Sequence, residues 1–159
     1  MTDSSNLQSD RSKQSTAAGH LFTRRFTSSD HATRTVLLEL IEGLSAKGVC
    51  DDDLANIELI LAEALNNVVE HAYTDAPGPV ELLIEIGGRG LSCQIVDNGH
   101  PIPSGEAPDP PLPTIEPPAD IPEGGFGWHI IRCLTTDLSY KRDGSRNTLY
   151  LLVPLADLD

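Results

Sequence analysis

Three polar residues recur at intervals of four in the segment 59–73, namely Glu63, Asn67 and His71. Four residues exceed one helical turn by about 40°, so on a helix these side chains would follow one row. The row borders apolar residues, and burying a carboxylate or an amide without a partner costs about 1–3 kcal/mol each. The row therefore needs polar partners, although a solvated helix face is the commoner explanation for Glu63 and Asn67 taken alone.

Asp97 is a second candidate, at the end of the segment 91–97, in which alternate residues are apolar. As a strand, this segment would point Asp97 inward at the edge of a sheet. An inward carboxylate could accept an N–H from the edge of a nucleobase. Asn98 and Gly99 follow at once, and the alternative is a simple Asp-Asn-Gly turn.

A glycine cluster, Gly124-Gly125-Phe126-Gly127, precedes a segment with helical character. Glycine lets the backbone approach a ligand closely, and the first turn of a helix offers free N–H groups to a phosphate. A lone glycine cluster is weak evidence, because flexible loops are often punctuated in the same way.

Hydrophobic periodicity predicts the elements that must position these residues. Turn and capping residues set their limits. The expected elements are a strand at 20–27, a helix from 28–30 to about 47, a second helix from 51 to about 73, strands at 80–86 and 91–97, a helix at about 128–135, and strands at 137–142 and 147–153. Strands joined by hairpins, with helices packed on one face, predict an α+β protein. We expect a two-layer α/β sandwich with a mixed, mostly antiparallel sheet.

Two segments carry no such pattern. Residues 1–19 are polar and aperiodic, so they are predicted to form a disordered tail. Residues 101–123 contain nine of the twelve prolines and no Lys or Arg, so they are predicted to form a long loop. A loop of this length is typical of a lid, and it lies between two candidate ligand motifs. Residues 20–159 would then form one domain with a Pro-rich lid at about 101–123.

Composition narrows the class of protein. The chain has 159 residues, a mass of 17.1 kDa and a formal net charge of −13. This acidity disfavours direct nucleic-acid binding and docking on an anionic membrane. The three cysteines are far apart and include no CxxC, which argues against a disulfide framework or a thiolate zinc site. The absence of an apolar leader or a spanning segment favours a cytoplasmic protein.

Taken together and in this order, the motifs resemble those of the anti-sigma-factor serine/threonine-protein kinases of the GHKL, or histidine-kinase-like, ATPase superfamily. The segment LILAEALNNVVEHAY at 59–73 resembles the N box of that superfamily. IVDNGHPI at 95–102 and EGGFGWHII at 123–131 resemble its two glycine boxes, and NTLYLLVP at 147–154 resembles its closing strand. The resemblance covers about 20–154 and implies the Bergerat ATP-binding fold.

The resemblance also implies roles for the helical row. Glu63 matches the general base that accepts the proton of the attacking hydroxyl or water. Asn67 matches the Mg²⁺ ligand, and an amide oxygen together with phosphate oxygens and waters suits that ion. His71 matches the end of the N box, where a packed histidine that closes the helix is an equally good reading.

Further roles concern the base and the phosphates. Asp97 matches the acceptor for the adenine amino group, and Gly99 is expected to leave room for the base. Gly125 and Gly127 match the phosphate-cradling turn. Thr148 matches a hydroxyl close to the adenine.

The predicted lid lacks the basic residues that could offset phosphate charge in the transition state. That charge must then be balanced by Mg²⁺, by a helix N-terminus or by an arginine from elsewhere in the chain. Arg34 and Arg132 are candidates by elimination only.

The predicted function is that of a Mg-ATP-dependent serine/threonine-protein kinase acting as an anti-sigma factor. The resemblance implies that it phosphorylates a small anti-anti-sigma protein of the STAS type and holds a sigma factor inactive. It also suggests a homodimer. The alternative is an ATP-binding regulatory module of the same fold with little or no phosphotransfer. A third reading is an acidic interaction protein that binds no nucleotide.

Overall fold

The computed structural model describes residues 21–110 and 126–156. The predicted tail at 1–19 and residues 111–123 of the predicted lid lie outside the described residues. The described elements are β1 (Phe22–Thr27), α1 (Asp30–Ala46), α2 (Asp51–Asn67), η1 (Val68–Ala72), β2 (Pro79–Gly87), β3 (Gly90–Asp97), α3 (Gly127–Leu134), β4 (Asp137–Asp143) and β5 (Arg146–Val153). Every predicted strand and helix is present, with ends shifted by one to a few residues.

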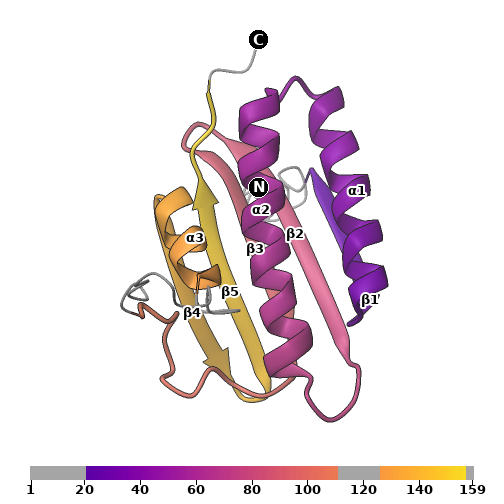
Figure 1. Cartoon of the computed structure of the whole chain (residues 1–159), viewed down its shortest axis with the longest axis vertical. Helices are drawn as coiled ribbons and strands as arrows, with labels where there is room; N and C mark the ends of the chain where they lie inside the picture. The colour runs from indigo at the N-terminus through magenta and orange to yellow at the C-terminus, as the bar shows by residue number, and fades with distance from the viewer. Residues whose placement is uncertain (1–20, 111–125, 157–159) are drawn as a thin grey trace, which may run out of the picture.

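The five strands form one sheet in the order β1-β2-β3-β5-β4, and each neighbouring pair is antiparallel. Helices α1, α2 and α3 lie on the same face of this sheet (Figure 1). The predicted two-layer α/β sandwich is therefore confirmed, and its sheet, predicted to be mixed and mostly antiparallel, is antiparallel throughout the described strands. The chain reaches the edge strand β4 through α3 and then returns by a hairpin, which places β5 directly beside β3.

Local sequence signals account for the helix ends. The hydroxyl of Ser29 accepts a hydrogen bond from the N–H of Ala32 at 3.0 Å, which caps α1. Gly48 has a φ of 92°, a left-handed conformation that glycine adopts readily, and it follows the end of α1. Three aspartates occupy the first turn of α2, where negative charge stabilises the positive end of the helix dipole.

The core lies between the helices and the facing side of the sheet. Fully buried side chains from both layers meet there, including Ile57, Ile60 and Leu61 of α2 and Leu82 and Ile95 of the sheet. Burial of each such side chain stabilises the fold by about 1.5–3 kcal/mol. Asp97 is the last residue of β3 and points to this same face of the sheet, so its carboxylate lies at the edge of the apolar core.

The helix predicted to end near residue 73 changes character before it ends. Regular α-helix stops at Asn67, and residues Val68–Ala72 form a π-helix, η1, closed by a hydrogen bond from Tyr73 N to Val68 O at 3.1 Å. Short π-helical segments occur frequently at functional sites. Apolar periodicity could not separate the two helix types, because both continue the same face of the chain.

None of the helices in the described part of the chain is both long and apolar enough to span a membrane.

Candidate functional site

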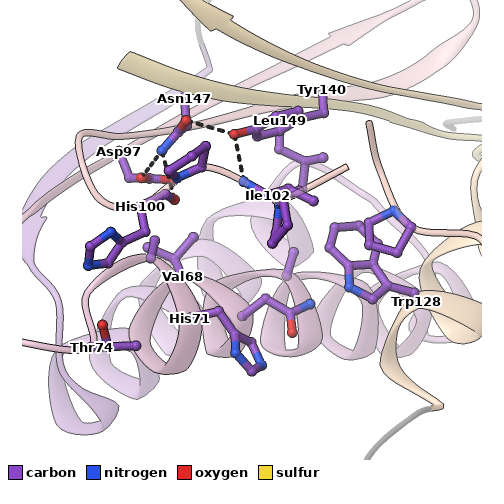
Figure 2. A pocket seen from close by; sticks show the side chains of 16 residues that line it. Val68, His71, Thr74, Asp97, His100, Ile102, Trp128, Tyr140, Asn147 and Leu149 are labelled. Atoms are coloured by element: carbon purple, nitrogen blue, oxygen red, sulfur yellow. Dashed lines mark hydrogen bonds between the residues drawn. The ribbon is translucent and has the colours of Figure 1, made fainter. Parts of the chain in front are cut away.

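A cavity of about 420 Å³ opens at the end of the sheet that carries Asp97. This volume is in the range of small-molecule sites. Sixteen residues line it, drawn from α2, η1, β3, β4, β5, α3 and the described start of the predicted lid (Figure 2). Its walls are largely apolar, and Val68, Ile102 and Leu149 are among them. Such walls suit a flat, largely apolar ligand with a few polar atoms at its edge.

Asp97 is the buried charge of this cavity, with only 6% of its surface exposed. Its Oδ1 accepts hydrogen bonds from Gly99 N at 2.9 Å and from Asn147 Nδ2 at 2.7 Å. Its Oδ2 accepts none from the residues that the structure describes. Because an ionised carboxylate is an acceptor only, Asp97 retains one oxygen for a donor on a ligand.

Asn147 sits beside Asp97 in the paired strands β3 and β5 and is 2% exposed. Its Nδ2 also donates to Gly99 O at 3.1 Å and to His100 O at 3.3 Å. Its Oδ1 accepts from Tyr140 OH at 2.7 Å and from Arg142 Nη1 at 2.8 Å. The two ends of the amide therefore face different partners, and they orient the group unambiguously.

The hydrogen-bond network around Asp97 continues to the segment that follows β3, at Ile102. Tyr140 OH accepts a hydrogen bond from Ile102 N at 3.0 Å. Figure 2 shows this path as dashed lines from Asp97 through Asn147 and Tyr140 to the backbone of Ile102. One buried network thus holds the carboxylate and an adjacent wall of the cavity in place.

Thr148 is not brought to the cavity. Asp97 pairs with Asn147, and Val96 pairs with Thr148. Since side chains alternate along a strand, Thr148 faces the side of the sheet away from Asp97, and it is absent from the cavity lining. The place beside Asp97 belongs to Asn147, one residue earlier than the sequence analysis expected.

Gly99 makes a close approach to η1. A Cβ at this position would collide with the carbonyl group of Ala72. The next residue completes the contact, because His100 N donates to Ala72 O at 2.7 Å. Gly99 therefore allows the turn after β3 to close against η1, and its expected role of leaving room for a base stays a prediction.

Glu63, Asn67 and Gly127 come together at another part of the site. A Cβ at Gly127 would lie 2.6 Å from Glu63 Oε2, so glycine lets the start of α3 approach this carboxylate. Asn67, one helical turn after Glu63, lines the cavity, whereas Glu63 is outside the lining set. Gly125, the other predicted phosphate-binding glycine, lies outside the described residues.

The amide nitrogen of Asn67 is buried and has no hydrogen-bond partner among the described residues. Leaving such a group unpaired costs about 1–3 kcal/mol. Because this nitrogen is a donor, it is accounted for if an acceptor, such as an oxygen of a ligand or of a water, completes it.

A family model described as histidine kinase-like ATPase domain matches residues 26–153. The chain belongs to this family. Serine-protein kinase RsbW of Bacillus cereus (strain AH820) is 25% identical over 104 residues, which is 64% of this chain and 65% of that protein. RsbW of Bacillus thuringiensis (strain Al Hakam) matches to the same extent. The match therefore spans just under two thirds of each of these relatives.

A solved structure shares the fold of this histidine kinase-like ATPase domain. The crystal structure of the RsbU and RsbW domains of Rv1364c from Mycobacterium tuberculosis superposes with a TM-score of 0.59 and 20% identity. The superposition covers 86% of this chain and 33% of that one.

The donor set of this histidine kinase-like ATPase domain fits a magnesium ion bound together with phosphates. The described residues contain no cluster of three or more His, Cys, Asp or Glu that could hold a metal by themselves. Mg²⁺ commonly takes only one or two protein ligands and completes its shell with phosphate oxygens and waters. The ligand from Asn67 would be its amide oxygen Oδ1, which accepts no hydrogen bond from the described residues, while the unpaired amide nitrogen could donate to a phosphate oxygen.

The two arginines considered for phosphate charge do not line the cavity. Arg34 is exposed on α1. Arg132 donates from Nε to Pro108 O at 2.7 Å and from Nη2 to Ala107 O at 2.6 Å. Its guanidinium is thus already engaged with backbone carbonyls.

Two histidines lie at the margin of the site. His71 and His100 both line the cavity, and His100 Nε2 is 3.0 Å from Asp75 Oδ2. The side chains of this His100–Asp75 pair are 58% and 85% exposed, so the contact contributes little to stability.

Sequence reasoning missed Asn147 and Tyr140 as site residues. The only signal for Asn147 is its place at the start of the closing strand. Reading that signal requires the register of β5 against β3, which joins residues 50 positions apart.

Proposed function

We propose that this chain binds Mg-ATP and is a protein-serine/threonine kinase. The observation that carries the proposal is the apposition of the Glu63 carboxylate and the Cα of Gly127 at the start of α3. A negative side chain faces a helix N-terminus there, one turn from Asn67. A helix N-terminus binds phosphate, so a carboxylate beside it would meet the hydroxyl that attacks that phosphate.

The base end of the cavity supports adenine as the nucleobase. Asp97 keeps Oδ2 for the adenine amino group, while Asn147 holds Oδ1. Guanine has a carbonyl oxygen in place of that amino group, and two acceptors would then face each other. The apolar walls would hold the ring.

The proposed transfer has a simple balance. Glu63 accepts the proton of a serine or threonine hydroxyl, and that oxygen bonds to the γ-phosphorus. The bond between the γ-phosphorus and the β–γ bridging oxygen breaks, and ADP leaves. Asn67 would hold Mg²⁺, which would neutralise charge on the phosphate oxygens when bound. Gly125 and Gly127 would cradle the phosphates.

The partner side of the proposal rests on the resemblance of the motifs to those of anti-sigma-factor kinases, and the relatives named serine-protein kinase RsbW support its kinase part. A kinase of this kind would phosphorylate a small anti-anti-sigma protein of the STAS type and would hold a sigma factor in the alternative complex. A homodimer is part of this proposal.

The test is transfer from γ-labelled ATP to a protein in a lysate of the source organism. We expect one small labelled acceptor with the wild-type chain. Glu63→Gln should bind ATP within about threefold of wild type but transfer about 10²–10⁴ times more slowly, the usual contribution of a general base.

Glu58→Gln is the matched control, because Glu58 is an exposed carboxylate on the same helix. It should transfer at the wild-type rate. Full transfer by Glu63→Gln would remove Glu63 as the base. ATP binding without any labelled acceptor would favour the regulatory module over the kinase.

A further inference from the structure

The described segment 101–110 forms one wall of the cavity. Pro101, Ile102, Pro103 and Pro108 all line it. Ala107 points into the hydrophobic core and is 9% exposed. A proline-rich segment has few N–H groups that can form hydrogen bonds to the rest of the protein. The few hydrogen bonds that do join it to the protein therefore determine how firmly the wall is held.

Among the described residues, three hydrogen bonds join 102–110 to the rest of the protein. One runs from Ile102 N to Tyr140 OH, and the other two come from the guanidinium of Arg132. The remaining bonds of the segment are internal turns, such as Gly105 N to Ile102 O at 2.9 Å. Two side chains therefore anchor the wall, one near each end.

The two anchors differ in their other duties. Tyr140 also donates to Asn147 and so belongs to the buried network around Asp97. Within the described part of the chain, the polar contacts of Arg132 are all with the wall 101–110. Its Nε and Nη2 donate to the successive carbonyls of Pro108 and Ala107, and its Nε is 3.7 Å from Asp109 Oδ1. A planar guanidinium that holds two acceptors at once fixes their geometry in a way that a single charged nitrogen does not.

We propose that Arg132 is a positioning residue that holds the wall 101–110 against the cavity and so limits how fast bound nucleotide leaves. This inference rests on the proposed nucleotide site. Arg132 does not line the cavity, and its donors are committed to Ala107 and Pro108. Its effect is therefore on the closure of the site and not on charge in the transition state.

The test measures displacement of a fluorescent ADP analogue from the full-length chain by stopped flow. Arg132→Gln should raise the dissociation rate by about tenfold or more, the value of one hydrogen bond to a charged group. Arg132→Lys should fall between wild type and Arg132→Gln, because one nitrogen can reach only part of the bidentate contact. The turnover rate at saturating ATP should change by less than about threefold in both variants, as a uniform loss of binding predicts.

Arg89→Gln is the matched control. It removes the same charge from the exposed β2–β3 turn, at the opposite end of those strands from Asp97. Its dissociation rate should equal that of wild type. An Arg132→Gln variant with an unchanged dissociation rate overturns the proposal, whether or not its turnover falls.

Failure of the proposed function is a separate outcome. If the wild-type chain binds no ADP analogue, that function fails, and amide hydrogen exchange of the free protein then tests the anchor. Arg132→Gln and Arg132→Lys should both speed exchange at Ile102, Gly105 and Glu106, with native circular dichroism retained. Unchanged exchange at these amides overturns the anchoring role.

Discussion

The two ends of the cavity satisfy their polar groups in different ways. At the base end, Asp97 and Asn147 belong to a buried network that reaches Tyr140, Arg142 and the backbone of Gly99. At the other end, the buried amide nitrogen of Asn67 has no partner in the described part of the chain, and Glu63 faces the bare Cα of Gly127. The first region satisfies its polar groups within the fold except for Asp97 Oδ2, whereas in the second the amide nitrogen of Asn67 is left for an acceptor on a ligand.

This difference follows from the backbone that carries each end. Paired strands place Asp97 and Asn147 in contact, so the strand register itself organises the base end. Packing of α3 on α2 forms the other end, and side-chain packing between helices includes no backbone hydrogen-bond ladder that fixes one element against the other. Preorganisation is therefore expected at the base end, with ligand-dependent order at the phosphate end.

The largest effect is expected from Asp97→Ala. Loss of the charged acceptor for the adenine amino group should weaken ATP binding by about 100-fold or more. Isothermal titration calorimetry measures this directly. Asp137→Ala, which removes an exposed carboxylate at the start of β4, is the control. Equal ATP affinity for Asp97→Ala and wild type would show that the base end is not where adenine binds.

An intermediate effect is expected from Asn67→Ala at the phosphate end. Wild-type ATP affinity should rise with Mg²⁺ by about tenfold, and the variant should bind ATP equally with Mg²⁺ or with EDTA. The control is Asn66→Ala, which changes the preceding residue of the helix. Asn66 is outside the cavity lining, so this variant should keep the wild-type response to Mg²⁺. If the Asn67→Ala variant still responded to Mg²⁺, the ion would be held elsewhere.

The smallest effect on ATP affinity is expected from substitutions at two neighbouring residues of β5, Asn147 and Thr148. Thr148→Val should leave ATP affinity within about twofold, because its side chain lies on the other face of the sheet. Asn147→Val should lower affinity by about tenfold, since it frees Asp97 Oδ1 and strands the hydroxyl of Tyr140. The reverse order of effects would mean that β5 is shifted by one residue relative to β3.

Much of this site was predictable because its signals are local. Spacing by four along one helix placed Glu63, Asn67 and His71 on a row, and the structure keeps Asn67 and His71 in the cavity lining. Strand alternation predicted the inward position of Asp97, which is buried. Capping and turn residues predicted a helix from 28–30 to about 47, and α1 spans Asp30–Ala46.

The errors concern contacts between distant segments. The contact of Gly99 with Ala72 was not predicted, because it depends on how η1 ends. Arg132 was considered for phosphate charge, yet its partners are carbonyls about 25 residues earlier in the chain. Neither contact leaves a trace in residue spacing.

The sequence alone determined the element order and the sandwich class, because periodicity and capping act over a few residues. It also singled out Asp97 at one end of the cavity and Glu63 and Asn67 at the other. The tertiary structure decided which residue of β5 stands beside Asp97 and which side chains hold the wall at 101–110. Strand register is set by packing between distant segments, and a shift of one residue exchanges the two faces of a strand. For that reason Asn147, and not Thr148, lies in the site.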